Sequence, residues 1–241
     1  MEWRKSYLDL TLVPLGILFS LLYHAWLWHK VRSQPLDTII GINSAGRRLW
    51  VLAMFKDNEK KNILAVQTIR NAIMGSTLMA TTSILLSSGL AAIISSTYSV
   101  KQPIGDSVYG AHGEVVVAMK YVVLLLFFLL AFLCYSLSIR FMNQVNFLIN
   151  VPLGDMCPVS TEYVTELLER GFMLNTMGNR LFYAAMPLLL WIFGPVLVFL
   201  SSATMVPILY NLDVVYGKGK GKGKGEGKGS MVGDGHGFMQ A

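Results

Sequence analysis

Hydrophobic positions fill four long stretches of the chain, and polar positions gather between them. The four stretches that lack Asp, Glu, Lys and Arg are residues 10–29, 71–100, 121–139 and 181–212. A helix needs about 20 mostly apolar residues to cross about 30 Å of hydrocarbon. The pattern therefore predicts an all-α integral membrane protein with four transmembrane helices, at about 8–28, 73–95, 121–139 and 181–203.

Two polar segments between these stretches have helical periodicity. In the first, residues 33–61, Ile39, Leu49 and Leu52 recur at spacings that suit an amphipathic helix. In the second, Ser160 is a candidate N-cap for a helix with one apolar and one charged face. We expect both to be interfacial or cytosolic helices. The first could lie on an anionic leaflet or form a solvated connection with a basic face.

The C-terminal residues differ in composition from the rest. Residues 213–241 are rich in Gly and Lys, and such a segment buries too little apolar surface to offset its ordering entropy. We expect a four-span membrane domain over 1–212 followed by a disordered tail over 213–241. The net charge of +6 includes five tail lysines, so the basic balance does not indicate nucleic-acid binding.

The distribution of charge also indicates which side of the membrane each connection faces. Four crossings would put both termini on one side, with the connections 30–70 and 140–180 on the other. These connections are rich in Lys and Arg, so the positive-inside rule favours a cytosolic location for them and places the termini outside. The tail lysines argue for the opposite orientation, but charges after the last span usually weigh less.

No residue pattern typical of catalysis or metal binding is present. The chain lacks HExxH, CxxC and paired carboxylates, and His24 and His29 are about 140° apart around a helix. Cys134 and Cys157 imply no disulfide framework. We therefore expect no metal, no cofactor and no enzymatic activity.

A set of Asn, Gln and Arg residues at the ends of three spans is the candidate site. We expect the three helices to bring these groups to one membrane boundary. Interhelical hydrogen bonding with phosphate anchoring is the favoured interpretation, and an anion or lipid-headgroup site is the alternative. The residues are Gln67, Arg70, Asn71, Arg140, Asn143, Asn179 and Arg180.

Small residues form a stripe along the second span, at positions Ser76, Ala80, Ser83, Ser87 and Ala91. Small side chains at this spacing let another helix approach closely in lipid, so a packing face is favoured over a pore lining.

Several segments resemble a family of plant multi-pass membrane proteins known only as domain of unknown function 599. They are YLDLTLVPLG (7–16), YHAWLWHKVR (23–32), NILAVQTIRN (62–71) and ERGFMLNTMGNRLFYAAMPLLLWIFGPVLVF (169–199). The resemblance covers residues 5–212. It implies four spans, a membrane location and a plant source, and it brings no activity, ligand or catalytic residue.

Three function classes follow. The first is a non-enzymatic membrane scaffold or assembly protein, and the second is a small oligomeric transporter or channel for an ion or small anion. A lipid-acting enzyme is the third and weakest. The expected partners are the bilayer, anionic lipid headgroups, and copies of the chain or other membrane proteins, but no nucleic acid. The secretory pathway or plasma membrane is the expected location.

Overall fold

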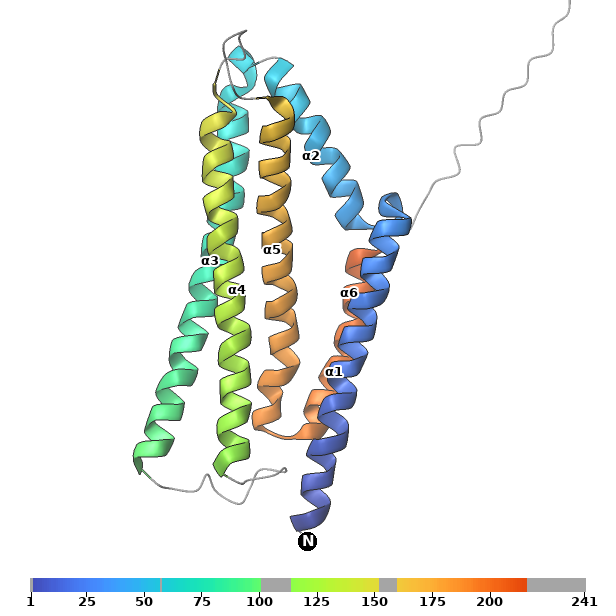
Figure 1. Ribbon diagram of the computed structural model, residues 1–241, viewed down its shortest axis with the longest axis vertical. Helices are drawn as coiled ribbons and strands as arrows, with labels where there is room; N and C mark the ends of the chain where they lie inside the picture. Colours follow the sequence, from blue (N-terminus) through green and yellow to red (C-terminus); the bar gives the residue numbers. More distant parts are fainter. Residues whose placement is uncertain (1, 57, 101–113, 152–159, 216–241) are drawn as a thin grey trace, which may run out of the picture.

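A computed structural model describes residues 2–56, 58–100, 114–151 and 160–215, which are helical apart from short turns (Figure 1). This confirms the all-α fold class. The tail beyond residue 215, expected to be disordered, lies outside the described residues. The elements are α1 (Glu2–Ser33), η1 (Pro35–Asp37), α2 (Ile39–Lys56), α3 (Asn58–Val100), α4 (Glu114–Leu148), α5 (Thr161–Leu189), η2 (Leu190–Ile192) and α6 (Pro195–Asp213).

The helices are arranged as a three-helix bundle and a two-helix pair. The long helices α3, α4 and α5 run side by side, and α4 is antiparallel to its two neighbours (Figure 1). The pair consists of α1 and α6, which are parallel. Phe19 contacts Phe199 near one end of the pair, and Thr38 bridges Val214 at the other. Helix α2 rises steeply from this second end to the far end of the bundle (Figure 1).

Four helices of the described chain are long and apolar enough to span a membrane. The apolar segments are Thr11–Ser33, Ile63–Ser96, Val117–Leu148 and Pro195–Asp213. They confirm the prediction of four helices that are long and apolar enough to span a membrane. Three of them contain nearly all of the predicted spans 8–28, 73–95 and 121–139.

The fourth apolar helix differs from the predicted span 181–203. Helix α5 is continuous from Thr161 to Leu189, and a turn then reverses the chain before α6 begins at Pro195. Gly194 has φ of 155°, a value that L side chains rarely adopt. Proline follows it at the first helical position, where it needs no amide hydrogen. The charge-free run 181–212 therefore contains the end of one helix and all of the next except its last residue, Asp213.

This turn changes the number of crossings. Helices α4 and α6 begin at the same end of the molecule, and α5 connects the far end of α4 to the beginning of α6 (Figure 1). A membrane that α4 and α6 both cross must therefore also be crossed by α5. Residue 2 and Val215 consequently lie at opposite ends of the α1–α6 pair. The sequence interpretation placed both termini on one side of the membrane, and residues 216–241 lie outside the described residues.

Burial explains why α5 lacks the hydropathy of a typical span. Only Met177 is exposed among its residues 174–189, whereas ten of the nineteen residues of α6 are exposed. Helix α5 therefore faces other helices, and α6 faces the surroundings. Side chains that face protein can be polar if they are hydrogen-bonded. Hydropathy, which detects lipid-facing apolar residues, therefore does not identify this helix as a span.

The small-residue stripe of α3 packs as a helix interface. Ser76, Ala80, Ser83 and Ser87 are all at most 6% exposed, and Ala80 contacts Ala131 and Tyr135 of α4. Ala91 is exposed instead, and Leu90 occupies the buried position. The favoured packing interpretation thus holds for the first four positions.

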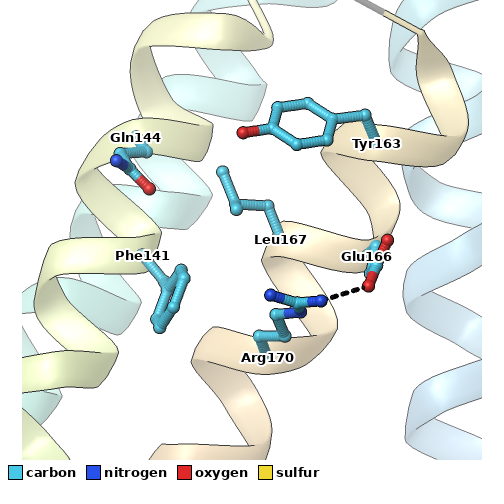
Figure 2. Close-up of a pocket in the computed structure, with 6 residues that line it drawn as sticks. All are labelled: Phe141, Gln144, Tyr163, Glu166, Leu167 and Arg170. Atoms are coloured by element: carbon cyan, nitrogen blue, oxygen red, sulfur yellow. Dashed lines mark hydrogen bonds and ion pairs between the residues drawn. The ribbon is translucent and has the colours of Figure 1, made fainter.

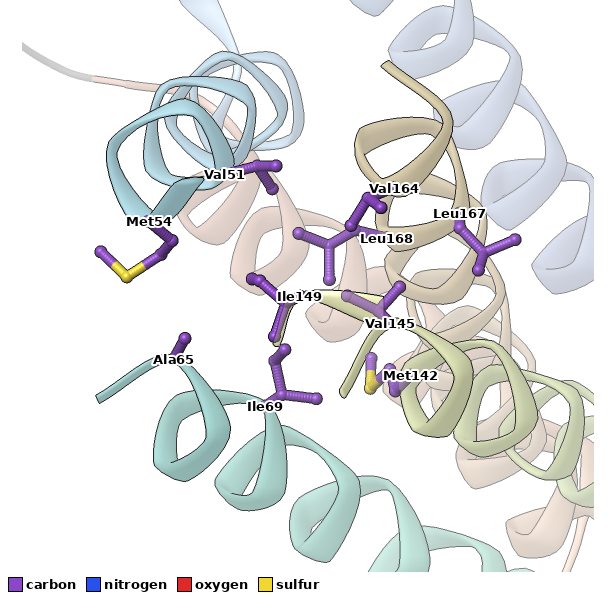
Figure 3. Packing of buried hydrophobic residues seen from close by; sticks show 10 residues of the cluster. All are labelled: Val51, Met54, Ala65, Ile69, Met142, Val145, Ile149, Val164, Leu167 and Leu168. Carbon is purple, nitrogen blue, oxygen red and sulfur yellow. The ribbon is translucent and has the colours of Figure 1, made fainter. Parts of the chain in front are cut away.

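Beyond the predicted spans 73–95 and 121–139, the bundle continues as a helical head, and the apolar segments of α3 and α4 extend into it as far as Ile63 and Leu148. We define the head as α2 together with residues 63–72 of α3, 140–148 of α4 and 161–172 of α5. All four helices contribute to its core, and Figure 3 shows their side chains gathered in the space between the helices. Val51, Met142, Val145 and Val164 are fully buried in it. Burying such a side chain stabilises the fold by about 1.5–3 kcal/mol, so the head has a hydrophobic core of its own.

Candidate functional site

Asp213, the most deeply buried acidic residue of the described chain, belongs to a cluster where α1, α5 and α6 meet. Arg180 of α5 forms an ion pair with Oδ1 of Asp213, the last residue of α6. The hydroxyl of Tyr23 on α1 donates a hydrogen bond to Oδ2 of the same carboxylate. The side chain of Asp213 is 5% exposed and that of Arg180 is 19% exposed. We call these three residues the Asp213 cluster.

Aromatic residues indicate the depth of the Asp213 cluster. Trp26 packs against Tyr210 with ring centroids 5.5 Å apart, and the ammonium of Lys30 lies 5.0 Å from the Trp26 ring. Trp and Tyr beside basic residues are typical of the headgroup level. Tyr23 lies one helical turn before Trp26, which places the cluster at the inner edge of this level.

The positive charge of the cluster is incompletely satisfied. Nη1 of Arg180 is buried and has no hydrogen-bond partner among the described residues. One carboxylate balances one guanidinium, so the cluster is close to neutral. Ionisable side chains within membrane-spanning segments are costly unless they are paired, and they commonly mark functional elements.

From Gly171, at the edge of the head, α5 carries a ladder of polar contacts at every fourth residue. The carbonyl of Gly171 accepts a hydrogen bond from Ser138 at 2.7 Å, and Oδ1 of Asn175 accepts one from Ser76 of α3 at 3.0 Å. Oδ1 of Asn179 accepts one from the hydroxyl of Tyr135 at 2.6 Å. These contacts bind α5 to both of its bundle neighbours. Interhelical hydrogen bonds of this kind contribute on average about 0.6 kcal/mol each in membrane proteins.

The structure separates the seven residues of the predicted polar cluster. Asn179 and Arg180 are partly buried in the ladder and in the Asp213 cluster. The other five, Gln67, Arg70, Asn71, Arg140 and Asn143, are exposed on α3 and α4. Arg140 lies close to the level of Gly171, and the eight residues from Gly171 to Asn179 correspond to about 12 Å along a helix. The three helices therefore do not bring these groups to one boundary.

Three important residues were missed by sequence reasoning. Tyr23, Tyr135 and Asp213 lie in or next to apolar runs, and Asp213 was assigned to the tail. The sequence did contain a signal that α5 contacts other helices. Gly171, Asn175 and Asn179 recur at a spacing of four residues, which places polar groups on one face of a helix. A polar face that continues into an apolar run indicates contact with protein rather than lipid.

The head carries a shallow groove between α4 and α5, with a volume of about 200 Å³ (Figure 2). Arg170 and Glu166 form an i, i+4 ion pair on its wall, with N–O distance 2.6 Å and both side chains more than half exposed. Phe141, Gln144 and Tyr163 complete much of the lining. An exposed pair at this spacing contributes only about 0.3–0.5 kcal/mol. Among the described residues, no three His, Cys, Asp or Glu side chains are grouped as metal ligands would be.

Helix α2 is fixed to α5 by a two-pronged ion pair. Nε and Nη2 of Arg47 donate to the two carboxylate oxygens of Glu169 at 2.9 and 2.8 Å. The same guanidinium lies 4.7 Å from the ring centroid of Phe172. This planar geometry is specific to arginine, and it sets which face of α2 points toward the bundle.

A family model described as "Protein of unknown function, DUF599" matches residues 11–217. The chain belongs to the DUF599 family. The resemblance drawn from the sequence is thereby confirmed, and the matched region of this DUF599 chain contains both the Asp213 cluster and the head. No curated protein and no solved structure was found to match the chain.

Proposed function

We propose that this DUF599 protein is a non-enzymatic membrane scaffold that holds a rigid helical head against one face of the bilayer for assembly with other proteins. The observation that carries the proposal is the head itself. Helices α3 and α4 continue beyond the predicted spans 73–95 and 121–139, and α2 and α5 join them around a shared core. The ion pair of Arg47 with Glu169 fixes α2 further.

The proposal places the head in the cytosol. The head side carries Arg47, Arg48, Lys56, Arg70 and Arg140, and the positive-inside rule assigns such a side to the cytosol. Crossing by α5 also brings Val215 to this side. The sequence after Val215 has five lysines and no run apolar enough to cross, so the tail charges now favour the same orientation.

Purification in mild detergent tests the scaffold role. A tagged chain from native membranes should migrate as a complex that contains at least one other protein. The complex should dissociate when Arg47→Ala releases α2, while Arg170→Ala, which affects only an exposed pair, should leave it intact. Isolation of the chain alone, with the head folded, would contradict the proposal.

A small transporter or channel is the second candidate, and the Asp213 cluster favours it. The Arg180–Asp213 ion pair links the α1–α6 pair to the three-helix bundle, and Tyr23 connects α1 to the same carboxylate. The turn at Gly194 offers a pivot between the pair and the bundle. A protein with so few spanning helices rarely encloses a path for ions by itself, so this role would require oligomers. Arg180→Gln should then alter ion or anion flux in proteoliposomes, whereas the exposed Arg70→Gln should not. Absence of flux with every ion tested would eliminate this candidate.

A further inference from the structure

An apolar seam runs along the outer face of α2, outside the apolar segments of the protein. Ile42, Ala45, Leu49 and Leu52 are all exposed, and their spacings of three, four and three residues place them on one side of the helix. The exposed fractions of the large members are 38% for Ile42, 68% for Leu49 and 53% for Leu52. This alternation of three and four is the spacing at which one helix packs against a second along its length.

The bundle contacts of α2 use its other faces. Val51 and Met54 are buried in the core shared with the bundle, and Arg47 is paired with Glu169. Because these contacts fix the rotation of α2, the seam is held outward. A flexible helix could turn its leucines inward, but a helix fixed by a core and an ion pair presents them continuously.

We infer that the α2 seam binds an acidic amphipathic helix of a partner protein. The eighteen residues of α2 include Arg47, Arg48 and Lys56 but no Asp or Glu. Arg48 flanks the seam and Lys56 extends it by one turn, and both are exposed. A partner helix with apolar residues facing the seam and Glu or Asp beside them would satisfy both features.

Two other occupants fit less well. A second copy that paired its α2 with this one would place Arg48 and Lys56 opposite like charges. A leaflet would reach only the beginning of the seam, since α2 rises steeply away from the ends of α1 and α6 (Figure 1). The seam is also short and single-sided, which suits one helix rather than a broad surface.

A designed peptide tests the inference with the full chain in nanodiscs of neutral lipid. The probe is an amphipathic helix of about 21 residues, or three heptads, with Leu at the seam positions and Glu beside them. The matched control has Lys in place of each Glu. The acidic peptide should bind at least about tenfold more tightly, and Arg48→Glu should reverse this preference. Equal binding of the two peptides, or binding of neither, would overturn the inference.

Variants locate the site. Leu49→Asp should weaken binding of the acidic peptide by about tenfold or more, as expected for a central interface residue. Ile63→Asp should leave it unchanged, although Ile63 is the more exposed residue at 79%. Equal losses in the two variants would mean nonspecific attraction to apolar surface and would refute the assignment.

The biological partner class requires a separate measurement, because the inference rests on the proposed scaffold function. A photoreactive side chain in place of Leu52, in native membranes, should label another protein, and the acidic peptide should compete with this labelling. Labelling of lipid or of a second copy would overturn the inference. If the protein purifies in a complex but the label at position 52 captures no partner, only the seam fails. If the label captures no partner and the protein purifies alone rather than in a complex, the scaffold function fails as well.

Discussion

The Asp213 cluster allows a quantitative prediction about stability. Asp213 is almost fully buried and receives one charged and one neutral donor, from Arg180 and Tyr23. Removing one partner of a buried ion pair typically costs about 3–5 kcal/mol, because the remaining charge loses its compensation. Asp213→Leu should therefore lower the free energy of unfolding by about 3 kcal/mol, the lower end of that range, since Arg180 is still partly exposed.

Adding a second substitution should recover most of this loss. Arg180→Leu in the Asp213→Leu background removes the uncompensated charge, and replacing a buried pair with apolar residues is often neutral or stabilising. Tyr23→Phe, added third, removes a hydroxyl that would otherwise be left without its acceptor at a cost of about 1 kcal/mol. The free energy of unfolding of the triple variant should thus lie within about 1 kcal/mol of that of the original chain.

Titration with SDS in mixed micelles measures these free energies. Glu166→Gln is the matched control, because its pair with Arg170 is exposed and should contribute about 0.5 kcal/mol or less. The decisive quantity is the coupling between the Asp213 and Arg180 substitutions. If their effects simply add, the two side chains do not compensate each other, and the reasoning is refuted.

Two further predictions concern the fold. Gly41→Ala should destabilise the protein by about 1–3 kcal/mol or more, because a Cβ there would overlap the carbonyl oxygen of Pro35 in the preceding turn. Gly46→Ala, with open space around it, should be neutral or stabilising when thermal unfolding is compared. Cysteines replacing Ser44 and Ser230 should be labelled from one side of the membrane, and a cysteine replacing Val108 from the other. Labelling of positions 108 and 230 from the same side would exclude a crossing by α5.

The lipid-facing part of the fold could be predicted from the sequence. The runs around 8–28, 73–95 and 121–139 are apolar because they face lipid, and hydropathy detects this environment directly. Helix α5 could not be found in this way, since its polar groups are satisfied by other helices. Its partners lie up to about a hundred residues away, as with Ser76 and Asn175, and no local pattern specifies such pairs.

The candidate site was predictable only in part for the same reason. Arg180 was recognised as a charge near a span, but its role depends on Asp213, which follows 33 residues later. That pairing exists only because the chain reverses at Gly194. The exposed Arg70 and Arg140 have the same sequence character as Arg180, and only the three-dimensional arrangement distinguishes them.

The polarity of α5 has a consequence for biosynthesis. An Arg in an isolated inserting helix costs up to about 2.5–3.5 kcal/mol at the helix centre and less toward the headgroup level, and the polar Asn175 and Asn179 add to the cost for α5. During translation α5 is complete before α6, which supplies the carboxylate that pairs with Arg180. We therefore expect α5 to wait at the translocon and to enter the bilayer together with α6, as a helical hairpin closed by Gly194 and Pro195.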